Sequence, residues 1–236
     1  MNLDTPPPRL RRAYFECRYG QLHVHNAIPA GGGFDELTTL ICLHASATTG
    51  RSFLALSKQL GRTRSVYSPD IPGCGESDAP PGKLASSGYA EAIGDFLDSM
   101  RFRQVDLLGM HSGAAVAAEL AIARPKVVRR VVMIGAPVLD ETERRSYREL
   151  SPPEGLSQGA LWARHAVIEW QAQERLPLVK QPLLVLRPKD NFWDGGARVN
   201  RFHTGARVID LPDQDKRILD AAPAVVAKHV LAFCAG

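Results

Sequence analysis

Residues 107–118 read LLGMHSGAAVAA, an apolar run followed by a short turn and a stretch of small, helix-compatible residues. The turn, residues 109–113, matches the pattern G-x-Nuc-x-G, in which Nuc is a nucleophile. Glycines two before and two after the nucleophile let a strand and a helix approach closely around one strained residue. Both glycines are present, and the central position holds His111. The stretch therefore predicts a strand, a sharp elbow that exposes His111, and a helix.

Apolar runs with the character of buried strands recur along the chain. They lie at residues 38–45, 65–70, 105–109, 130–135, 182–187 and 206–211. They lack clean alternation of apolar and polar residues, which is typical of parallel strands covered on both faces. Helical stretches are expected between or after them, at residues 52–61, 87–100, 112–125 and 221–234. This alternation predicts a doubly wound α/β sheet, mostly parallel.

Two segments depart from this rhythm. Residues 13–28 alternate apolar and polar side chains around Tyr19-Gly20, which predicts an N-terminal antiparallel hairpin. Residues 140–180 are charged and carry Trp162 and Trp170 in an expected helix. We interpret residues 140–180 as a small cap inserted into a core formed by residues 1–139 and 181–236. A pair of ordinary surface helices is the alternative.

Several motifs, in this order, resemble those of the α/β-hydrolase superfamily. Residues 40–53 resemble its His-Gly loop, and residues 68–78 resemble its D-x-P-G-x-G-x-S-D loop. Residues 107–137 resemble its elbow with the following strand, residues 182–192 its acid loop, and residues 224–233 its last helix. Ala45 stands where the His-Gly loop usually has glycine. The resemblance implies an α/β-hydrolase fold with a short cap, and it leaves the chemistry open because one fold hosts many activities.

The chemistry of that superfamily uses a nucleophile, an acid and a histidine in this chain order. By resemblance, the nucleophile position falls on His111 and the acid position on Asp190. Counting back from Pro223 places Lys216 at the third position. The usual histidine is therefore absent from its loop, and two of the three residues differ from the family pattern.

The residue at the third position and the register of the elbow both leave alternatives open. Lys216 could pair with Asp190, point to solvent or bind an anionic ligand. Asp140, just past the sixth strand, is a reserve acid. A shift of one residue would make Ser112 the nucleophile, but both flanking glycines would then be out of register.

A backbone oxyanion hole does not depend on these side chains. Its expected donors are the amide of Ser112 and one amide in the Ala45–Ser46 region. The residues expected around the pocket are His44, Met110, Trp162, His165 and Phe192. Simple packing is the alternative for His165 and Phe192, and His44 is expected chiefly to hold the loop. His23 and His25 are expected on the surface of the hairpin.

Composition excludes several other classes of function. The formal charge of +4 comes from scattered arginines without interleaved aromatic residues, so we expect no nucleic-acid binding. The longest apolar runs are far shorter than the roughly 20 residues of a membrane helix, and the N-terminal MNLDTPPPRLRR has no apolar segment of a secretory signal. Four widely separated cysteines fit reduced thiols of a cytoplasmic protein, with no metal site and no cofactor.

These observations favour an enzyme acting on a small carbonyl or ester substrate. His111 would serve as a general base oriented by Asp190, in place of a serine nucleophile. The alternative is a catalytically silent relative that binds a small ligand or a partner protein through the same pocket. The sequence does not indicate an oligomeric state.

Overall fold

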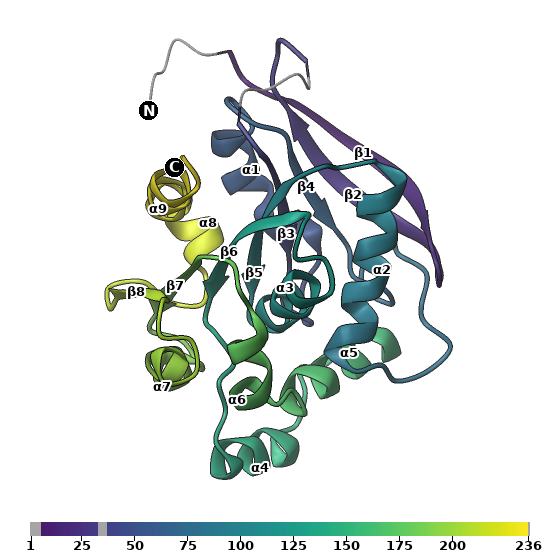
Figure 1. The fold of residues 1–236 in the computed structure, drawn as a ribbon. Coiled ribbons are helices and arrows are strands. Elements are labelled where there is room, and N and C mark those ends of the chain that lie inside the picture. The colour runs from purple at the N-terminus through teal and green to yellow at the C-terminus, as the bar shows by residue number, and fades with distance from the viewer. Residues whose placement is uncertain (1–5, 33–36, 236) are drawn as a thin grey trace.

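The computed structural model describes residues 6–32 and 37–235, and their strands form one sheet (Figure 1). The strand order is β1-β2-β4-β3-β5-β6-β7-β8. The strands are β1 (Arg9–Cys17), β2 (Gly20–Ile28), β3 (Thr39–Leu43), β4 (Val66–Pro69), β5 (Val105–Met110), β6 (Val128–Ile134), β7 (Leu183–Pro188) and β8 (Arg207–Leu211). The α/β-hydrolase fold expected from the sequence is confirmed, because each apolar run predicted to be a strand is one.

The sheet is antiparallel at one edge and parallel elsewhere. β1 and β2 form the predicted hairpin, with Arg9 opposite Ile28 and Cys17 opposite Gly20. β2 also runs antiparallel to β4, and the pairs from β4 through β8 are parallel. The carboxyl ends of β3 and β5 to β8 therefore point to one end of the sheet, where open α/β sheets assemble their sites.

Helices cover both faces of the sheet (Figure 1). On one face, α2 and α3 pack in a core with Ile93, Phe96 and Leu120. On the other, α1, α8 and α9 pack around Leu56 and Val230. The helices of these layers are α1 (Leu54–Leu60), α2 (Ser86–Ser99), α3 (Ser112–Ala123), α8 (Ile218–Ala221) and α9 (Pro223–Cys234), with the 3-10 turn η1 (Gly50–Phe53) before α1.

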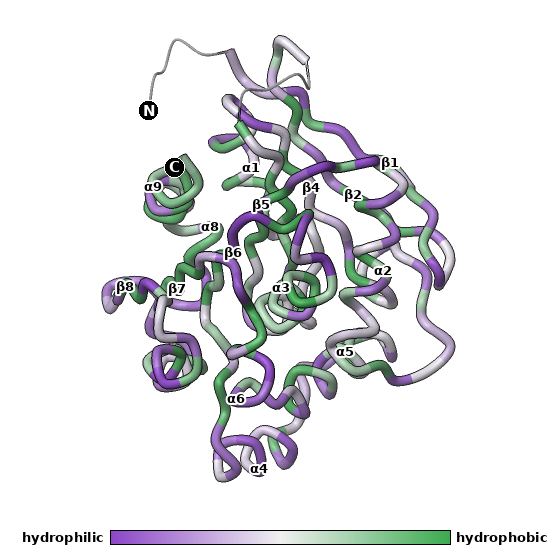
Figure 2. The backbone as a smooth tube through the Cα atoms, in the orientation of Figure 1, coloured by the Kyte–Doolittle hydropathy of each residue, from purple (hydrophilic) through white to green (hydrophobic). Residues whose placement is uncertain are grey.

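The segment between β6 and β7 lies at one end of the molecule, away from α1 and α9 (Figure 1). It contains α4 (Glu141–Glu149), α5 (Gln158–Ile168), α6 (Ala172–Arg175) and η2 (Leu176–Leu178), and α7 (Trp193–Arg198) and η3 (Val199–Arg201) follow β7. Figure 2 shows that α4 is largely hydrophilic, whereas α3 is mostly hydrophobic. That contrast fits a helix at the surface and a helix buried against the sheet.

Three residues lie in environments that the sequence did not predict. Trp170 lies beyond the end of α5, and its indole N–H donates to Glu119 at 2.8 Å. His23 is 1% exposed, so its expected place on the strand surface is wrong. Asp140 is not a reserve acid but the N-cap of α4, where it accepts from the Glu143 amide at 2.9 Å. A capping carboxylate next to the helix is a common local solution that competes with any catalytic use.

Among the described residues, no helix combines the length and apolar character needed to cross a bilayer. The four cysteines are unpaired thiols, of which Cys42, Cys74 and Cys234 are buried and Cys17 is half-buried. Burial raises the pKa of Cys74 and of Cys234 to about 12 and raises the pKa of Cys42 further. Burial also raises the pKa of Cys17, by a smaller amount.

These environments predict selective thiol labelling. Because the thiolate is the nucleophile, a raised pKa slows attack at neutral pH. In native protein at pH 7.5 or so, we expect Ellman's reagent to label Cys17 slowly and to spare the other three until a denaturant is added. The rate at Cys17 should rise with pH, and Cys17→Ser should abolish native labelling. Rapid labelling of a second thiol in the folded protein would contradict this burial pattern.

Candidate active site

The turn between β5 and α3 places His111 in a strained backbone conformation. His111 has φ of 50° and ψ of −112°, and β5 ends at the residue before it. A positive φ is uncommon outside glycine, and such strain collects at functional sites. The residue after it, Ser112, begins α3, so the elbow residue lies at the positive end of a 12-residue helix.

The two glycines of the elbow are required by the close approach of backbone segments. A Cβ at Gly113 would lie 2.0 Å from the carbonyl oxygen of Leu43 in β3. A Cβ at Gly109 would lie 2.3 Å from the carbonyl oxygen of Gly113. Neither distance is sterically possible for a real side chain. The glycines therefore set the register of the elbow on His111 and not on Ser112.

His111 and Asp190 form a direct pair. Their Nε2 and Oδ2 atoms are 2.8 Å apart, and Asp190 lies two residues beyond the end of β7. The Asp190 side chain is 1% exposed and that of His111 19% exposed. The Phe192 amide donates to Asp190 Oδ1 at 2.8 Å and fixes the carboxylate. A carboxylate accepts hydrogen bonds and does not donate them, so the neutral imidazole that fits this contact has its proton on Nε2 and its lone pair on Nδ1.

Gly135 leaves the space that this pair occupies, and sequence reasoning missed it. It follows β6 with φ of 61°, and a Cβ there would lie 2.5 Å from both Asp190 Oδ2 and His111 Cδ2. The one signal in the sequence is its place at the end of a predicted strand.

Two aromatic residues form a wall beside the imidazole. The ring of Phe192 meets that of His111 at 4.9 Å between centroids, edge to face. Tyr147 of α4 stacks on Phe192 at 5.5 Å, and its hydroxyl donates to the Asn191 carbonyl at 2.8 Å. Burial raises the pKa of Tyr147 to about 12, so its hydroxyl stays protonated at neutral pH. The segment containing α4 thus contributes directly to the surroundings of His111.

The expected oxyanion donors lie beside His111, but one of them is already bonded. The Ser46 amide donates to Ser112 Oγ at 2.6 Å. Ser112 is 3% exposed, and its hydroxyl oxygen is thereby held toward the loop after β3. Its own O–H proton stays available as a donor. Of the Ala45–Ser46 region expected to supply the second donor, the Ser46 amide thus has the Ser112 hydroxyl oxygen in its donor direction.

His44 holds this loop from below and does not line the cavity beside His111. It is fully buried, its Nδ1 bonds to the Ala45 carbonyl at 2.8 Å, and its Nε2 accepts from the Ile71 amide at 2.9 Å. Burial lowers its pKa, which keeps the imidazole neutral. His44 therefore connects the loop after β3 with the loop after β4.

The structure does not place Lys216 at Asp190. Lys216 is exposed in the loop between β8 and α8, whereas the ring nitrogen bonded to Asp190 belongs to His111. Lys216 therefore does not take the place of the missing histidine. The imidazole of His111 contacts the acid directly, without an intervening residue.

A cavity of about 350 Å³ lies over His111. It is bounded by the elbow and the loop after β3, by the loop after β7, and by the segment with α4 and α5. Its lining is Ala45, Ser46, Ala47, His111, Ser112, Leu139, Tyr147, Leu150, Ser151, Pro153, Arg164, Val167, Ile168, Asn191 and Phe192. Arg164 is the one cationic side chain in this lining.

Of the residues predicted for the pocket, Phe192 lines this cavity. Met110 is buried in the core beneath the elbow. Trp162 is half-buried on α5 outside the lining, and the exposed His165 lines a different cavity with Glu169 and Trp170. Sequence reasoning missed Tyr147 and Arg164, because their segment shows no periodicity that tells which side chains face the sheet.

Comparison with known proteins gives a consistent result. The model of the Alpha/beta hydrolase family matches residues 40–233. A 2-hydroxymuconate semialdehyde hydrolase of Pseudomonas putida is 31% identical over 137 residues, which cover 58% of this chain and 47% of that protein. An uncharacterized protein of Mycobacterium tuberculosis is 25% identical over 158 residues, 67% of this chain and 44% of the relative. The chain thus spans less than half the length of these curated relatives.

Solved structures share the fold at low sequence identity. A hydrolase from Pseudomonas aeruginosa superposes with a TM-score of 0.81 at 19% identity, covering 96% of this chain and 99% of that one. The enol-lactonase of Burkholderia xenovorans gives a TM-score of 0.78 at 16% identity, covering 95% and 100%. At these identities the likeness concerns the fold.

The elbow geometry predicts a large cost for a single methyl group. Gly113→Ala should lower the free energy of unfolding by about 1–3 kcal/mol or more, because the new Cβ meets the Leu43 backbone. Gly82→Ala is the matched control, since a Cβ at Gly82 meets no atom within 4 Å. We expect that control to change stability by no more than about 0.5 kcal/mol. Urea unfolding of the three proteins measures both effects, and equal midpoints would contradict the close approach.

Proposed function

Because this chain belongs to the α/β-hydrolase family, we propose that it is a hydrolase that cleaves an ester or a carbon–carbon bond next to a carbonyl in a small molecule, with His111 as general base. The observation that supports this most is the 2.8 Å pair between His111 and the buried Asp190 at the mouth of a cavity. A carboxylate bonded to one ring nitrogen fixes the tautomer and stabilises the imidazolium that forms during proton transfer.

The proposed reaction begins with water at the free Nδ1 of His111. The imidazole takes a proton from that water while its oxygen bonds to the carbonyl carbon of the substrate. The resulting oxyanion is stabilised by the amide and hydroxyl of Ser112 and by the N-terminus of α3. The imidazolium then gives its proton to the leaving oxygen or carbon, and the carbonyl re-forms. No covalent acyl-enzyme is required.

The cavity favours a compact, largely apolar substrate with one anionic group. Leu139, Leu150, Val167, Ile168 and Phe192 supply the apolar surface. Arg164 is half-buried, and its Nη2 donates to the Tyr147 and Leu150 carbonyls at 2.7 and 2.8 Å. Its remaining N–H groups are available to a carboxylate. The relative named as a 2-hydroxymuconate semialdehyde hydrolase and the structural neighbour named as an enol-lactonase fit this size class.

We also propose that residues 140–180 act as a cap over this cavity. Seven of the lining residues come from this segment, namely Tyr147, Leu150, Ser151, Pro153, Arg164, Val167 and Ile168. The buried Arg144 supports the arrangement from within, because its guanidinium donates to the carbonyl of Ile168 and also to that of Trp170. Substrate selection would then depend chiefly on this segment.

A catalytically silent binding protein is the second candidate, and one observation favours it. The Ser46 amide is engaged by Ser112 Oγ at 2.6 Å, so one of the two backbone donors of an oxyanion hole is occupied. Such a protein would bind a small ligand in the same cavity without turning it over.

The general-base proposal predicts that His111→Ala lowers kcat on activated short-chain esters or lactones by about 10²–10⁴-fold, the usual contribution of a positioned general base. The matched control is His165→Ala, which removes an exposed histidine that lines a different cavity. It should retain native turnover. Circular dichroism and thermal melts confirm that each variant is folded.

The same assay separates the alternatives. The proposal expects no burst of the first product before the steady state. A burst, together with complete loss of turnover in Ser112→Ala, would overturn it in favour of a serine nucleophile. Undetectable turnover by the native protein on esters, lactones and carbon–carbon substrates, combined with ligand binding that tolerates His111→Ala, would favour the silent protein.

Arg164 gives a separate prediction about the substrate. Arg164→Gln should raise KM for an ester with a terminal carboxylate by about 10- to 100-fold, since a hydrogen bond to a charged group is worth about 1.5–3 kcal/mol. KM for the neutral methyl-ester analogue of that substrate should change little. Steady-state kinetics on the matched pair test this, and equal losses on both would assign Arg164 to holding the cap alone.

A further inference from the structure

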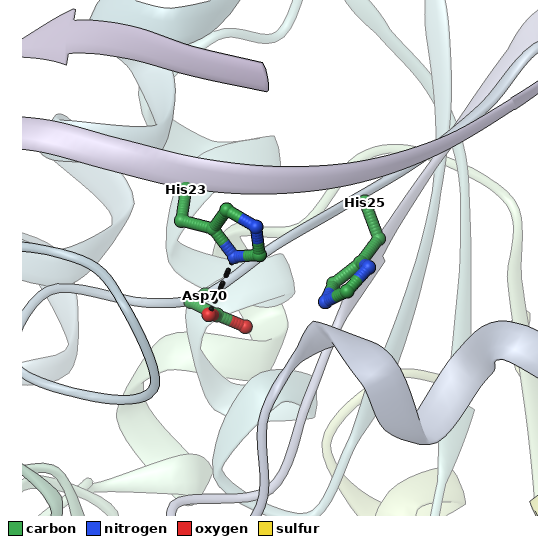
Figure 3. Close-up of side chains that lie close together, drawn as sticks. All are labelled: His23, His25 and Asp70. Atoms are coloured by element: carbon green, nitrogen blue, oxygen red, sulfur yellow. Dashed lines mark hydrogen bonds and ion pairs between the residues drawn. The ribbon is translucent and has the colours of Figure 1, made fainter. Parts of the chain in front are cut away.

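A second cluster of chemically active side chains lies on the hairpin side of the sheet, apart from the cavity over His111. His23 and His25 project from the same face of β2, because alternate residues of a strand share a face. Asp70 follows β4, which pairs antiparallel with β2, and its amide donates to the His23 carbonyl at 2.8 Å. In Figure 3 both imidazoles extend from the strand toward the Asp70 carboxylate.

The three side chains of this cluster lie close together and are largely buried. One potential ligand atom from each of the three side chains lies within 4.8 Å of the other two. His23 and Asp70 are each 1% exposed, and His25 is half-buried. The two imidazole rings meet edge to face at 4.7 Å between centroids. His25 has no hydrogen bond to any described residue that would fix its ring.

Outer contacts position Asp70 and His23 firmly. Asp70 Oδ1 accepts from the Gly50 amide at 2.6 Å, and Oδ2 accepts from the Glu76 amide at 3.0 Å and bonds to His23 Nδ1 at 3.0 Å. Ser77 Oγ donates to the Asp70 carbonyl at 2.7 Å and accepts from the His23 amide at 2.9 Å. Such supporting bonds are what orients the ligands of metal sites in proteins.

The cluster opens onto a groove of about 930 Å³. Its lining includes Arg12 and Tyr14 of β1, Arg51 and Leu54 from the segment after β3, and Glu76. His23 and His25 both belong to its lining. The groove gives an ion from solvent a path to the imidazoles.

The geometry points to a binding site for a divalent transition metal such as Zn²⁺, with His23, His25 and Asp70 as its protein ligands and the groove supplying the open position. This site is independent of the proposed hydrolase function. It departs from the expectation of no metal site, because two histidines expected on the strand surface are instead gathered around a buried carboxylate.

The donor set fits this class of ion. Two imidazole nitrogens and one carboxylate oxygen suit zinc and its neighbours and do not suit Mg²⁺ or Ca²⁺, which prefer oxygen ligands. Ligand atoms of a tetrahedral zinc site lie about 3.4 Å apart, as its metal–ligand distances of about 2.0–2.2 Å require. Rotation of the loosely held His25 ring can close the remaining gap. The ion would replace the proton that Nδ1 of His23 shares with Asp70.

The test uses the full chain, stripped with EDTA and titrated with Co²⁺ and then with Zn²⁺. We expect one Co²⁺ per chain with the visible absorption of a low-coordinate site, displaced by Zn²⁺, and a thermal midpoint that rises with Zn²⁺. His25→Ala should weaken Zn²⁺ binding at least 100-fold by calorimetry and remove the stabilisation. Mg²⁺ should give no heat and no stabilisation.

Two variants keep the outcome clear. His229→Ala removes another half-buried histidine, on α9, and should bind Zn²⁺ as the native chain does. His111→Ala should also bind normally, which separates this site from the proposed active site. Absence of Co²⁺ binding by the native chain would overturn the proposal. So would equal binding by folded His25→Ala, since the ion would then be held adventitiously elsewhere and the His23–Asp70 pair would act only as a loop support.

Discussion

The close approach of β5, α3 and β3 at Gly109 and Gly113 is the constraint on which the site depends. Backbone oxygens lie where a Cβ at either glycine would be, so the chain can pass from strand to helix there only by a sharp turn. That turn forces one intervening residue, His111, to a φ of 50°. The strain is held in place by buried elements on both sides, and it lifts the imidazole out of the core toward the carboxyl ends of the strands.

Once the imidazole is lifted there, its surroundings follow from neighbouring strands. Asp190 lies just beyond the end of β7, and Gly135 after β6 leaves the space in which the His111 and Asp190 side chains meet. The acid therefore reaches the elbow residue directly, and the third position of the family pattern is not needed to connect them. Lys216, which stands at that third position, is exposed and does not contact the pair.

The chain uses the same pair of residue types twice, in different environments. His111 and Asp190 meet below a cavity, with the imidazole partly exposed. His23 and Asp70 meet where both side chains are buried, with a second imidazole beside them. His44 links the loops next to the two pairs through the Ala45 carbonyl and the Ile71 amide. The two pairs therefore differ in exposure and in the neighbouring side chain.

The sequence by itself determined the order of strands and helices, the hairpin and the elbow, because these depend on local periodicity and on glycine positions within a few residues. It also indicated His111, between the two glycines of the elbow, and, through the resemblance to the α/β-hydrolase superfamily, Asp190 near the end of a predicted strand. Only the tertiary structure decided that these two meet, that Ser112 engages the Ser46 amide, that Tyr147 and Arg164 line the cavity, and that His23 is buried beside Asp70. Those facts depend on contacts between segments distant in the chain, where packing and available space, not local propensity, select the partner.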